Sequence, residues 1–176
     1  MNTEQLKTIE GLKLAIQIEI DGKKYYEEAA EKSASALGKQ VFEWLAGEED
    51  KHRNRFEQIC EAIRNRKDWP RIVIEPGGEN RARRVFLEAA RENPAEMTDN
   101  SIEQDIIINA LDMEDKTFNL YTERSKSAKS DAERNFYDAL AAEERGHFLA
   151  LTDYREYLID PAGYFTRTER HSLDGG

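Results

Sequence analysis

The sequence predicts an all-α protein: an antiparallel four-helix bundle with a long crossover between its second and third helices. Alanine, glutamate, leucine and lysine recur at helical spacing, while glycine and proline are clustered between the helical segments. Short connections near residues 37–38 and 129–130 imply two antiparallel hairpins. The two halves of the chain also repeat each other, with Glu19 corresponding to Glu114, 95 residues later.

We expect the four long helices over residues 5–34, 38–66, 101–128 and 131–159. The fourth begins with a capping box, in which Ser130 and Glu133 satisfy free backbone N–H groups. Residues 67–100 form the crossover that a bundle with parallel second and third helices requires, and ENRARRVFLEAARE is a short helix within it. Residues 1–160 are thus one domain, followed by an irregular tail over 161–176. The four prolines fall outside the four long helices, at Pro70, Pro76, Pro94 and Pro161.

Composition excludes several classes of protein. The single cysteine, Cys60, cannot form an intramolecular disulfide, and without a Cys-x-x-Cys pair these residues contain no rubredoxin-like module. The net charge of −10, from 36 acidic and 26 basic residues, argues against a nucleic-acid partner. The N-terminus does not read as a secretory signal, and no apolar stretch approaches the ~20 residues of a membrane helix. We therefore expect a cytoplasmic protein without a membrane partner.

The residues that repeat most faithfully are polar. Glu49 and His52 form a Glu-x-x-His pair in the second helix, and Glu144 and His147 form its counterpart in the fourth. This spacing places a carboxylate and an imidazole on one helix face. Of the three histidines in the chain, two satisfy the pattern at matched positions, which chance alone does not explain well.

Two further glutamates occupy positions that a bundle core would normally give to leucine. Glu19 lies in AIQIEI and Glu114 in ALDMED. Four carboxylates meeting in a core would repel one another and cost several kcal/mol each to desolvate, unless cations neutralise them. Two divalent ions would balance four carboxylates. Oxygen and nitrogen ligands together suit iron or manganese, and zinc is also compatible.

The segments AIQIEIDGKKYYEEA, FEWLAGEEDKH, ALDMEDKTFNLY and ALAAEERGH resemble the rubrerythrin branch of the ferritin-like di-iron carboxylate family. The resemblance covers nearly the whole chain. It implies a ferritin-like bundle, a homodimer and two iron ions. Bridging by Glu49 and Glu144, or by Glu49 and Glu114, is left open. The ligands it implies are Glu19, Glu49, His52, Glu114, Glu144 and His147.

The resemblance also assigns a role to two tyrosines. Tyr26 and Tyr121 each follow a ligand glutamate by seven residues, two turns along the same helix face. In the family such tyrosines donate hydrogen bonds to ligand carboxylates, which makes them our candidate catalytic residues. The alternative is that they are core aromatics whose hydroxyls find any acceptor.

The function implied by the resemblance is reduction of hydrogen peroxide or dioxygen, with electrons from a separate donor protein. Ferroxidase activity with iron storage is the alternative within this fold, and a metal-binding scaffold without turnover is the alternative outside enzymes. One departure concerns Thr117, where rubrerythrins carry an additional glutamate implicated in redox-linked movement of an iron. Its repeat counterpart is Gly22, and we expect these two small residues to leave room beside the metals for the oxidant.

Overall fold

The computed structural model of the chain describes residues 3–65, 68–74, 77–94 and 101–173. The described residues form helices and no strand, so the predicted all-α class is confirmed. The helices are α1 (Thr3–Lys32), α2 (Ala36–Arg64), α3 (Gly78–Glu92), α4 (Ser101–Lys126), α5 (Asp131–Ile159) and α6 (Pro161–Leu173).

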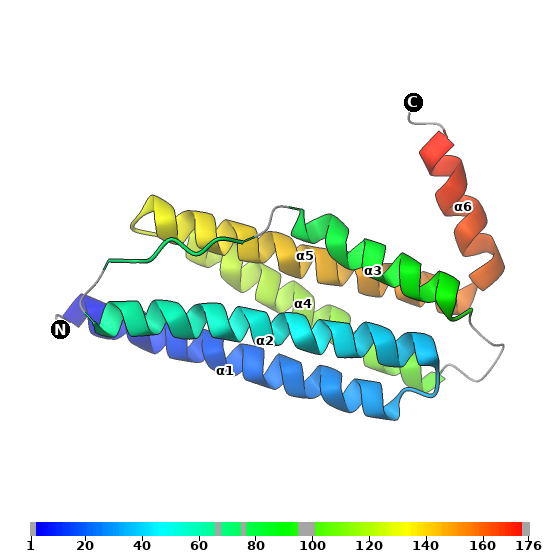
Figure 1. Cartoon of the computed structure of the whole chain (residues 1–176), viewed down its shortest axis with the longest axis horizontal. Helices are drawn as coiled ribbons and strands as arrows, with labels where there is room; N and C mark the ends of the chain where they lie inside the picture. The colour runs from blue at the N-terminus through cyan, green and yellow to red at the C-terminus, as the bar shows by residue number, and fades with distance from the viewer. Residues whose placement is uncertain (1–2, 66–67, 75–76, 95–100, 174–176) are drawn as a thin grey trace.

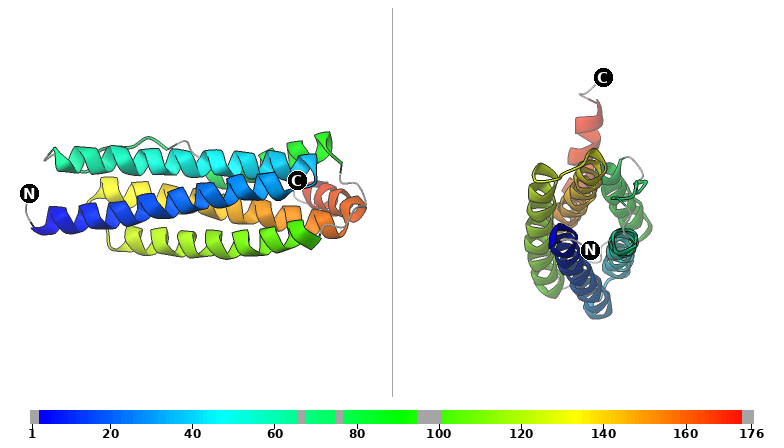
Figure 2. Two further views of the ribbon diagram at one scale, coloured as in Figure 1. Left: turned by 90° about the horizontal axis from the view of Figure 1, so that it is seen from below. Right: turned by 90° about the vertical axis from the view of Figure 1, so that its left-hand side faces the viewer.

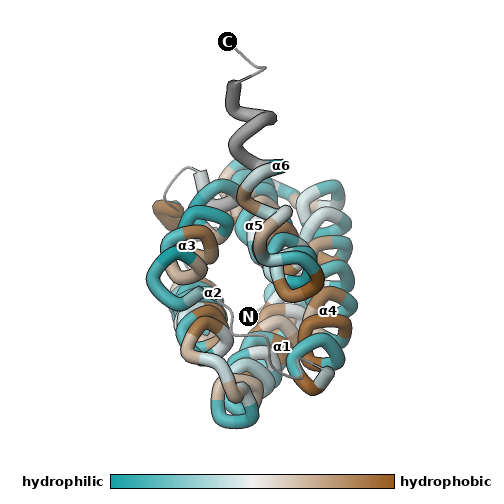
Figure 3. The backbone as a smooth tube through the Cα atoms, turned by 90° about the vertical axis from the view of Figure 1, so that its right-hand side faces the viewer, coloured by the Kyte–Doolittle hydropathy of each residue, from teal (hydrophilic) through white to brown (hydrophobic). Residues whose placement is uncertain are grey.

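The four long helices form two antiparallel hairpins, α1 with α2 and α4 with α5 (Figure 1). Helices α2 and α4 run in the same direction, as the long crossover requires (Figure 1). Viewed along the bundle, α1, α2, α4 and α5 surround a common interior (Figure 3). The predicted bundle with its crossover between the second and third long helices is therefore confirmed.

The internal repeat extends to the helix boundaries. Helices α2 and α5 begin at residues 36 and 131 and end at 64 and 159, an offset of 95 at both ends. Each starts after a serine cap: Ser35 Oγ accepts from Gly38 N at 2.9 Å, and Ser130 Oγ accepts from Glu133 N at 3.2 Å. The other arm of the predicted capping box differs by one residue, because Glu133 Oε2 accepts from Lys129 N at 2.9 Å.

The core consists of two apolar clusters, one toward each end of the bundle. The first contains Leu45, Ile107 and Leu151, and the second contains Phe56 and Leu140. In each long helix, the glutamates and histidines singled out above fall between residues of the two clusters. Burying these apolar side chains stabilises the fold by about 25 cal/mol per Å², and it fixes the polar layer between them.

The crossover supports the bundle from outside. Helix α3 lies over α5 and, to a smaller extent, α2, which confirms the short helix expected there. Trp69, Ile72 and Ile74 precede it and pack against the second apolar cluster. Pro70 and Pro94 lie outside helices as expected, whereas Pro76 lies outside the described residues.

The expected irregular tail is wrong over Pro161–Leu173, which form α6 at the far end of the bundle from the start of α1 (Figure 2). Asp160 Oδ1 accepts a hydrogen bond from Gly163 N at 2.9 Å, and Pro161 occupies the first helical position, where its fixed φ favours a helix. Tyr164 is buried against Phe86 and Tyr157. Residues 174–176 lie outside the described residues.

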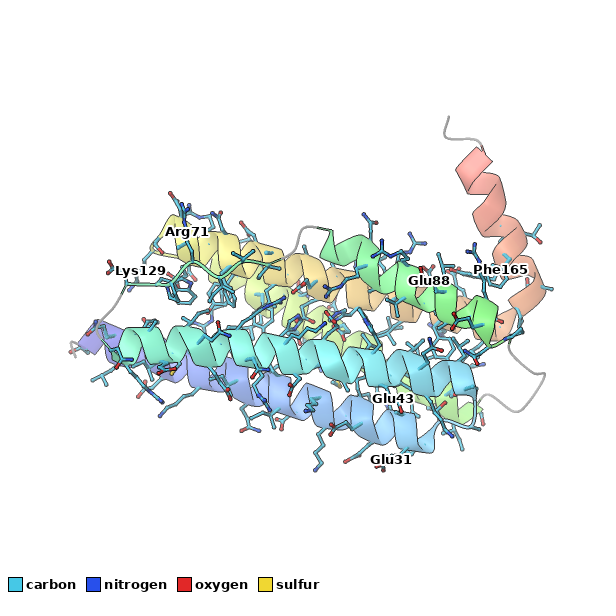
Figure 4. All side chains as sticks on the ribbon, in the orientation of Figure 1. Glu31, Glu43, Arg71, Glu88, Lys129 and Phe165 are labelled. Carbon is cyan, nitrogen blue, oxygen red and sulfur yellow. The ribbon has the colours of Figure 1, made fainter. Side chains whose placement is uncertain are left out.

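The outer surface is densely charged. Glu31, Glu43 and Glu88 are exposed on α1, α2 and α3, and Lys129 is exposed on the connection between α4 and α5 (Figure 4). Within the described part of the chain, no helix combines the length and apolar character that crossing a membrane requires.

Candidate metal centre

The structure brings the six predicted ligands together in the middle of the bundle. All six side chains are buried; His52 is 0% and His147 1% exposed. The His52 Nδ1 atom lies 3.4 Å from a Glu19 oxygen and 3.1 Å from a Glu144 oxygen. The His147 Nδ1 atom lies 3.5 Å from oxygens of both Glu114 and Glu144. Every long helix therefore contributes to one cluster.

The six side chains divide into two overlapping groups. Within each group, one ligand atom from every member lies within 4.8 Å of the others. Glu49 and Glu144 belong to both groups, the position expected of bridging carboxylates. Of the two bridging pairs that the sequence left open, this geometry favours Glu49 with Glu144. The groups are Glu19, Glu49, His52 and Glu144, and Glu49, Glu114, Glu144 and His147.

The atoms that face the centre of the cluster fit a pair of divalent cations. The Nδ1 atoms of His52 and His147, and one oxygen each of Glu19, Glu114 and Glu144, are buried without a hydrogen-bond partner of acceptable geometry. Leaving a buried polar atom unpaired costs about 1–3 kcal/mol. Five such atoms converging on one volume indicate coordination sites, and their role as ligands stays a prediction.

The electrostatics of the metal-free cluster oppose full ionisation of its buried carboxylates. Burial raises the pKa of Glu114 to about 7, and burial with the Glu144 and Glu19 charges raises the pKa of Glu49 well above its usual range. Burial opposes charge on the histidines, but the Glu144 carboxylate raises the pKa of His52 and the Glu114 carboxylate that of His147. Without metal, the cluster therefore retains protons near neutral pH, and metal binding must displace them.

The two candidate catalytic tyrosines form a reciprocal pair across the bundle. The Tyr26 hydroxyl donates to a Glu114 oxygen, and the Tyr121 hydroxyl donates to a Glu19 oxygen. Each tyrosine therefore fixes the glutamate of the other half of the repeat. Burial, reinforced by the neighbouring carboxylates, raises the pKa of both tyrosines well above 10, so both remain protonated donors.

The Glu143 carboxylate, which is paired with arginine, contacts His52 on the ring nitrogen that faces away from the cluster. The His52 Nε2 atom lies 3.2 Å from a Glu143 oxygen, which also accepts a hydrogen bond from Arg55. Arg81 of α3 contacts Glu143 at 3.5 Å and donates to Glu48. Burial raises the pKa of Glu143, but His52 and Arg55 outweigh it and lower that pKa to about 2. Glu143 is thus an ionised acceptor that holds Nδ1 of His52 toward the cluster.

Replacing Glu143 by glutamine is expected to weaken metal binding by about 10- to 100-fold, because the histidine loses its charged acceptor. Glu48→Gln is the matched control, since it removes a carboxylate from the repeat-related position, where Glu48 pairs with Lys51 and Arg81 instead. Competition with a chelator measures both affinities. Equal affinities in the two variants would contradict a supporting role for Glu143.

A cavity of about 520 Å³ opens beside the cluster, between α1 and α4. Glu49, Glu114 and Glu144 line its inner end. Gly22 and Thr117 also line it, which confirms that these two small residues leave space beside the cluster. The cavity gives a small molecule direct access to the carboxylates of the second group.

Sequence reasoning found the six clustered residues and both tyrosines, but it missed Arg55 and Arg81. Arg81 belongs to the basic run RARR in α3, a run too short to indicate nucleic-acid binding. The structure shows part of its use: Arg81 contacts buried Glu48 and Glu143, and Arg83 contacts Asp153 at 2.5 Å. The signal that could have predicted these contacts was a basic run on the crossover of a bundle whose core is rich in glutamate.

The fold and the site define a ferritin-like helical bundle with a buried glutamate and histidine cluster suited to metal. The family model described as Rubrerythrin matches residues 10–153, a span that includes all six clustered residues. The chain therefore belongs to the rubrerythrin family. Comparisons with the curated proteins and with the solved structures found no match.

Proposed function

We propose that the chain is a di-iron oxidoreductase that reduces hydrogen peroxide or dioxygen. The observation that carries the proposal is the pair of overlapping ligand groups, whose buried inner atoms lack hydrogen-bond partners. Membership of the rubrerythrin family supports iron as the metal, although the ligand set also suits manganese and zinc. When bound by these residues, two iron ions would supply two electrons, one from each ion, to the oxygen species.

The protein's part in this chemistry is to hold the ligand side chains in position and to limit the access of water to them. Tyr26 and Tyr121 orient Glu114 and Glu19 by donating hydrogen bonds to them. Glu143 orients His52. The two apolar clusters exclude water from the bundle interior on either side of the site along the bundle, which strengthens each of these electrostatic contacts.

Access and protons are provided on one side of the cluster. The oxidant reaches Glu49, Glu114 and Glu144 through the cavity beside Gly22 and Thr117. Metal binding displaces the protons that Glu49 and Glu114 retain in the metal-free protein, so the protons consumed in turnover enter from solvent through the same cavity. The tyrosines donate hydrogen bonds but do not ionise at neutral pH, because burial raises their pKa values.

The electrons come from a separate donor protein in this proposal. The 176 residues include one cysteine, Cys60, which is buried, so they hold no rubredoxin-type iron site. Reduction of one peroxide to two waters consumes two electrons and two protons. The donor must therefore restore both electrons after each turnover.

The proposal is tested by mixing anaerobically iron-loaded protein with hydrogen peroxide or with air in a stopped-flow spectrophotometer. We expect rapid growth of a ferric absorption with at least one oxidant, followed by repeated turnover when a chemical reductant is supplied. Oxidation without repeated turnover, in particles large enough to enclose an iron core, would favour ferroxidase and storage. No rapid reaction with either oxidant would favour a metal-binding scaffold. The particle that we expect is a homodimer whose mass does not change during the reaction.

The small residues of the cavity lead to a prediction about reactivity. Gly22→Glu or Thr117→Glu places a carboxylate where the oxidant enters, so we expect each variant to bind metal normally but react differently with peroxide. Metal analysis and the stopped-flow rate are measured on the same sample. Unchanged turnover in both variants would show that the oxidant does not use this space.

A further inference from the structure

The cavity beside the cluster is much larger than peroxide or dioxygen requires. Its volume is about 520 Å³, whereas a water molecule occupies about 30 Å³ of liquid. Cavities of roughly 300–1,000 Å³ are typical of sites for small organic molecules. An oxidant of two heavy atoms therefore leaves most of this space for something else.

The cavity walls are mainly apolar. Ile18, Met113 and Leu120 contribute aliphatic or thioether surface, and Tyr25 contributes its ring. The Tyr25 hydroxyl is engaged elsewhere, because it donates to the Ile106 carbonyl oxygen at 2.8 Å. Thioether and aromatic surfaces together favour a flat apolar guest, since sulfur and ring edges both contact rings well.

The charges at the cavity do not favour an ionic guest. Asp21 and Lys116 also line it, but each interacts along its own helix: Asp21 accepts from Gln17 at 2.9 Å, and Lys116 contacts Asp112 at 2.5 Å. At the inner end, the Glu49, Glu114 and Glu144 carboxylates would repel an anion in the metal-free protein. In the metal-loaded protein two divalent ions would balance the four carboxylates of the cluster, which leaves no net charge to attract a cation. An uncharged molecule avoids this repulsion and any loss of the existing pairs.

The free space depends on one backbone position in particular. Gly22 is buried in the middle of α1, where glycine costs about 1 kcal/mol relative to alanine. A Cβ atom at Gly22 would lie 3.5 Å from the Glu49 side chain, an ordinary contact, so a larger residue is sterically compatible with the backbone there. Its side chain would occupy the cavity next to the cluster.

We propose that this cavity binds a small, uncharged, mainly apolar organic molecule, held between α1 and α4 against Glu49, Glu114 and Glu144. The idea that the guest is a second substrate rests on the proposed di-iron function. The idea that the cavity binds the guest does not depend on that function. A guest in this position lies directly beside the metal-facing carboxylates. It is therefore placed to be acted on there, or to control the access of the oxidant.

The test uses N-phenyl-1-naphthylamine, an uncharged dye that fluoresces strongly in apolar surroundings, with the zinc-loaded protein, which undergoes no redox turnover. We expect saturable binding of one dye per chain. Gly22→Leu fills the cavity and should weaken binding at least 10-fold, as should Thr117→Leu. Gly47→Leu is the matched control, because Gly47 is also a mid-helix glycine and is exposed. Apart from its chain neighbours and its own helix backbone, nothing lies within 4 Å of a Cβ atom added there.

Dye binding that the two cavity variants lose and Gly47→Leu retains, with zinc content unchanged in all three, would establish the site. No saturable binding to the unsubstituted protein, or equal binding by Gly22→Leu, Thr117→Leu and Gly47→Leu, would overturn it. Reduction of peroxide and of dioxygen is measured separately on the iron-loaded protein. A protein that binds the dye without reducing either oxidant would refute the proposed function alone, and the reverse result would refute this inference alone.

Discussion

Glu144→Ala is expected to abolish binding of both metal ions, with the affinity at each position falling by more than about 100-fold. Glu144 belongs to both ligand groups, and its two oxygens lie near different histidines, 3.1 Å from His52 and 3.5 Å from His147. Removing a ligand should cost more than removing a residue that supports one, which typically costs 10- to 100-fold. Metal analysis after equilibrium dialysis measures the loss.

Two comparisons make this prediction specific. Glu19→Ala and Glu114→Ala each alter one group, so we expect each variant to retain about one metal ion per chain. Glu43→Ala removes an exposed glutamate from α2 and should retain both ions (Figure 4). Circular dichroism establishes that the variants remain helical. Retention of two ions by Glu144→Ala would show that it does not bridge.

The second large effect is a reversal in how stability depends on pH when metal is removed. In the metal-free protein, burial raises the pKa values of Glu49 and Glu114, the latter to about 7, and neighbouring carboxylates raise those of His52 and His147. Groups with raised pKa values bind more protons when folded, so their stabilisation is lost as pH rises through the folded values. The lowered pKa of Glu144 affects the pH dependence of stability only below about pH 4.5, which is more acidic than these folded values.

We therefore expect the metal-free protein to lose stability from about pH 5 to pH 8, with its melting temperature falling by about 5 °C or more. The metal-loaded protein should become more stable over the same range, because fewer protons compete with the metal. At a free metal concentration of about 100 times Kd, two ions add about 5 kcal/mol, or roughly 10–20 °C. Thermal scans of both forms measure the slopes. Parallel slopes would contradict a cluster that exchanges protons for metal.

The parts of the fold that the sequence predicted well are those with local or repeated signals. The 95-residue offset between Glu19 and Glu114 indicated two equivalent hairpins, and the observed bounds of α2 and α5 preserve that offset. Ser130 marked the start of α5 correctly. Helix α6 was missed although its signal was present, because Asp160 followed by Pro161 is a capping residue followed by a favoured first helical residue.

The parts of the site that the sequence did not predict depend on contacts between distant elements. Arg81 of α3 contacts Glu143 of α5, and the two residues lie 62 positions apart in the sequence. Nothing in the local sequence around either residue specifies this contact. Favouring one bridging pair over the other likewise required knowing which carboxylates lie near both histidines. The cavity is similar: Gly22 and Thr117 suggested space, but its volume depends on how far apart α1 and α4 lie.

The most direct measurement is an anaerobic titration of the metal-free protein with ferrous iron, followed calorimetrically to saturation at pH 7. Two overlapping ligand groups predict saturation at two irons per chain, with release of protons from the cluster as each ion binds. Proton release is obtained by repeating the titration in buffers of different ionisation enthalpy. Saturation at one iron per chain, or no saturable binding, would contradict a di-iron centre built from these six residues.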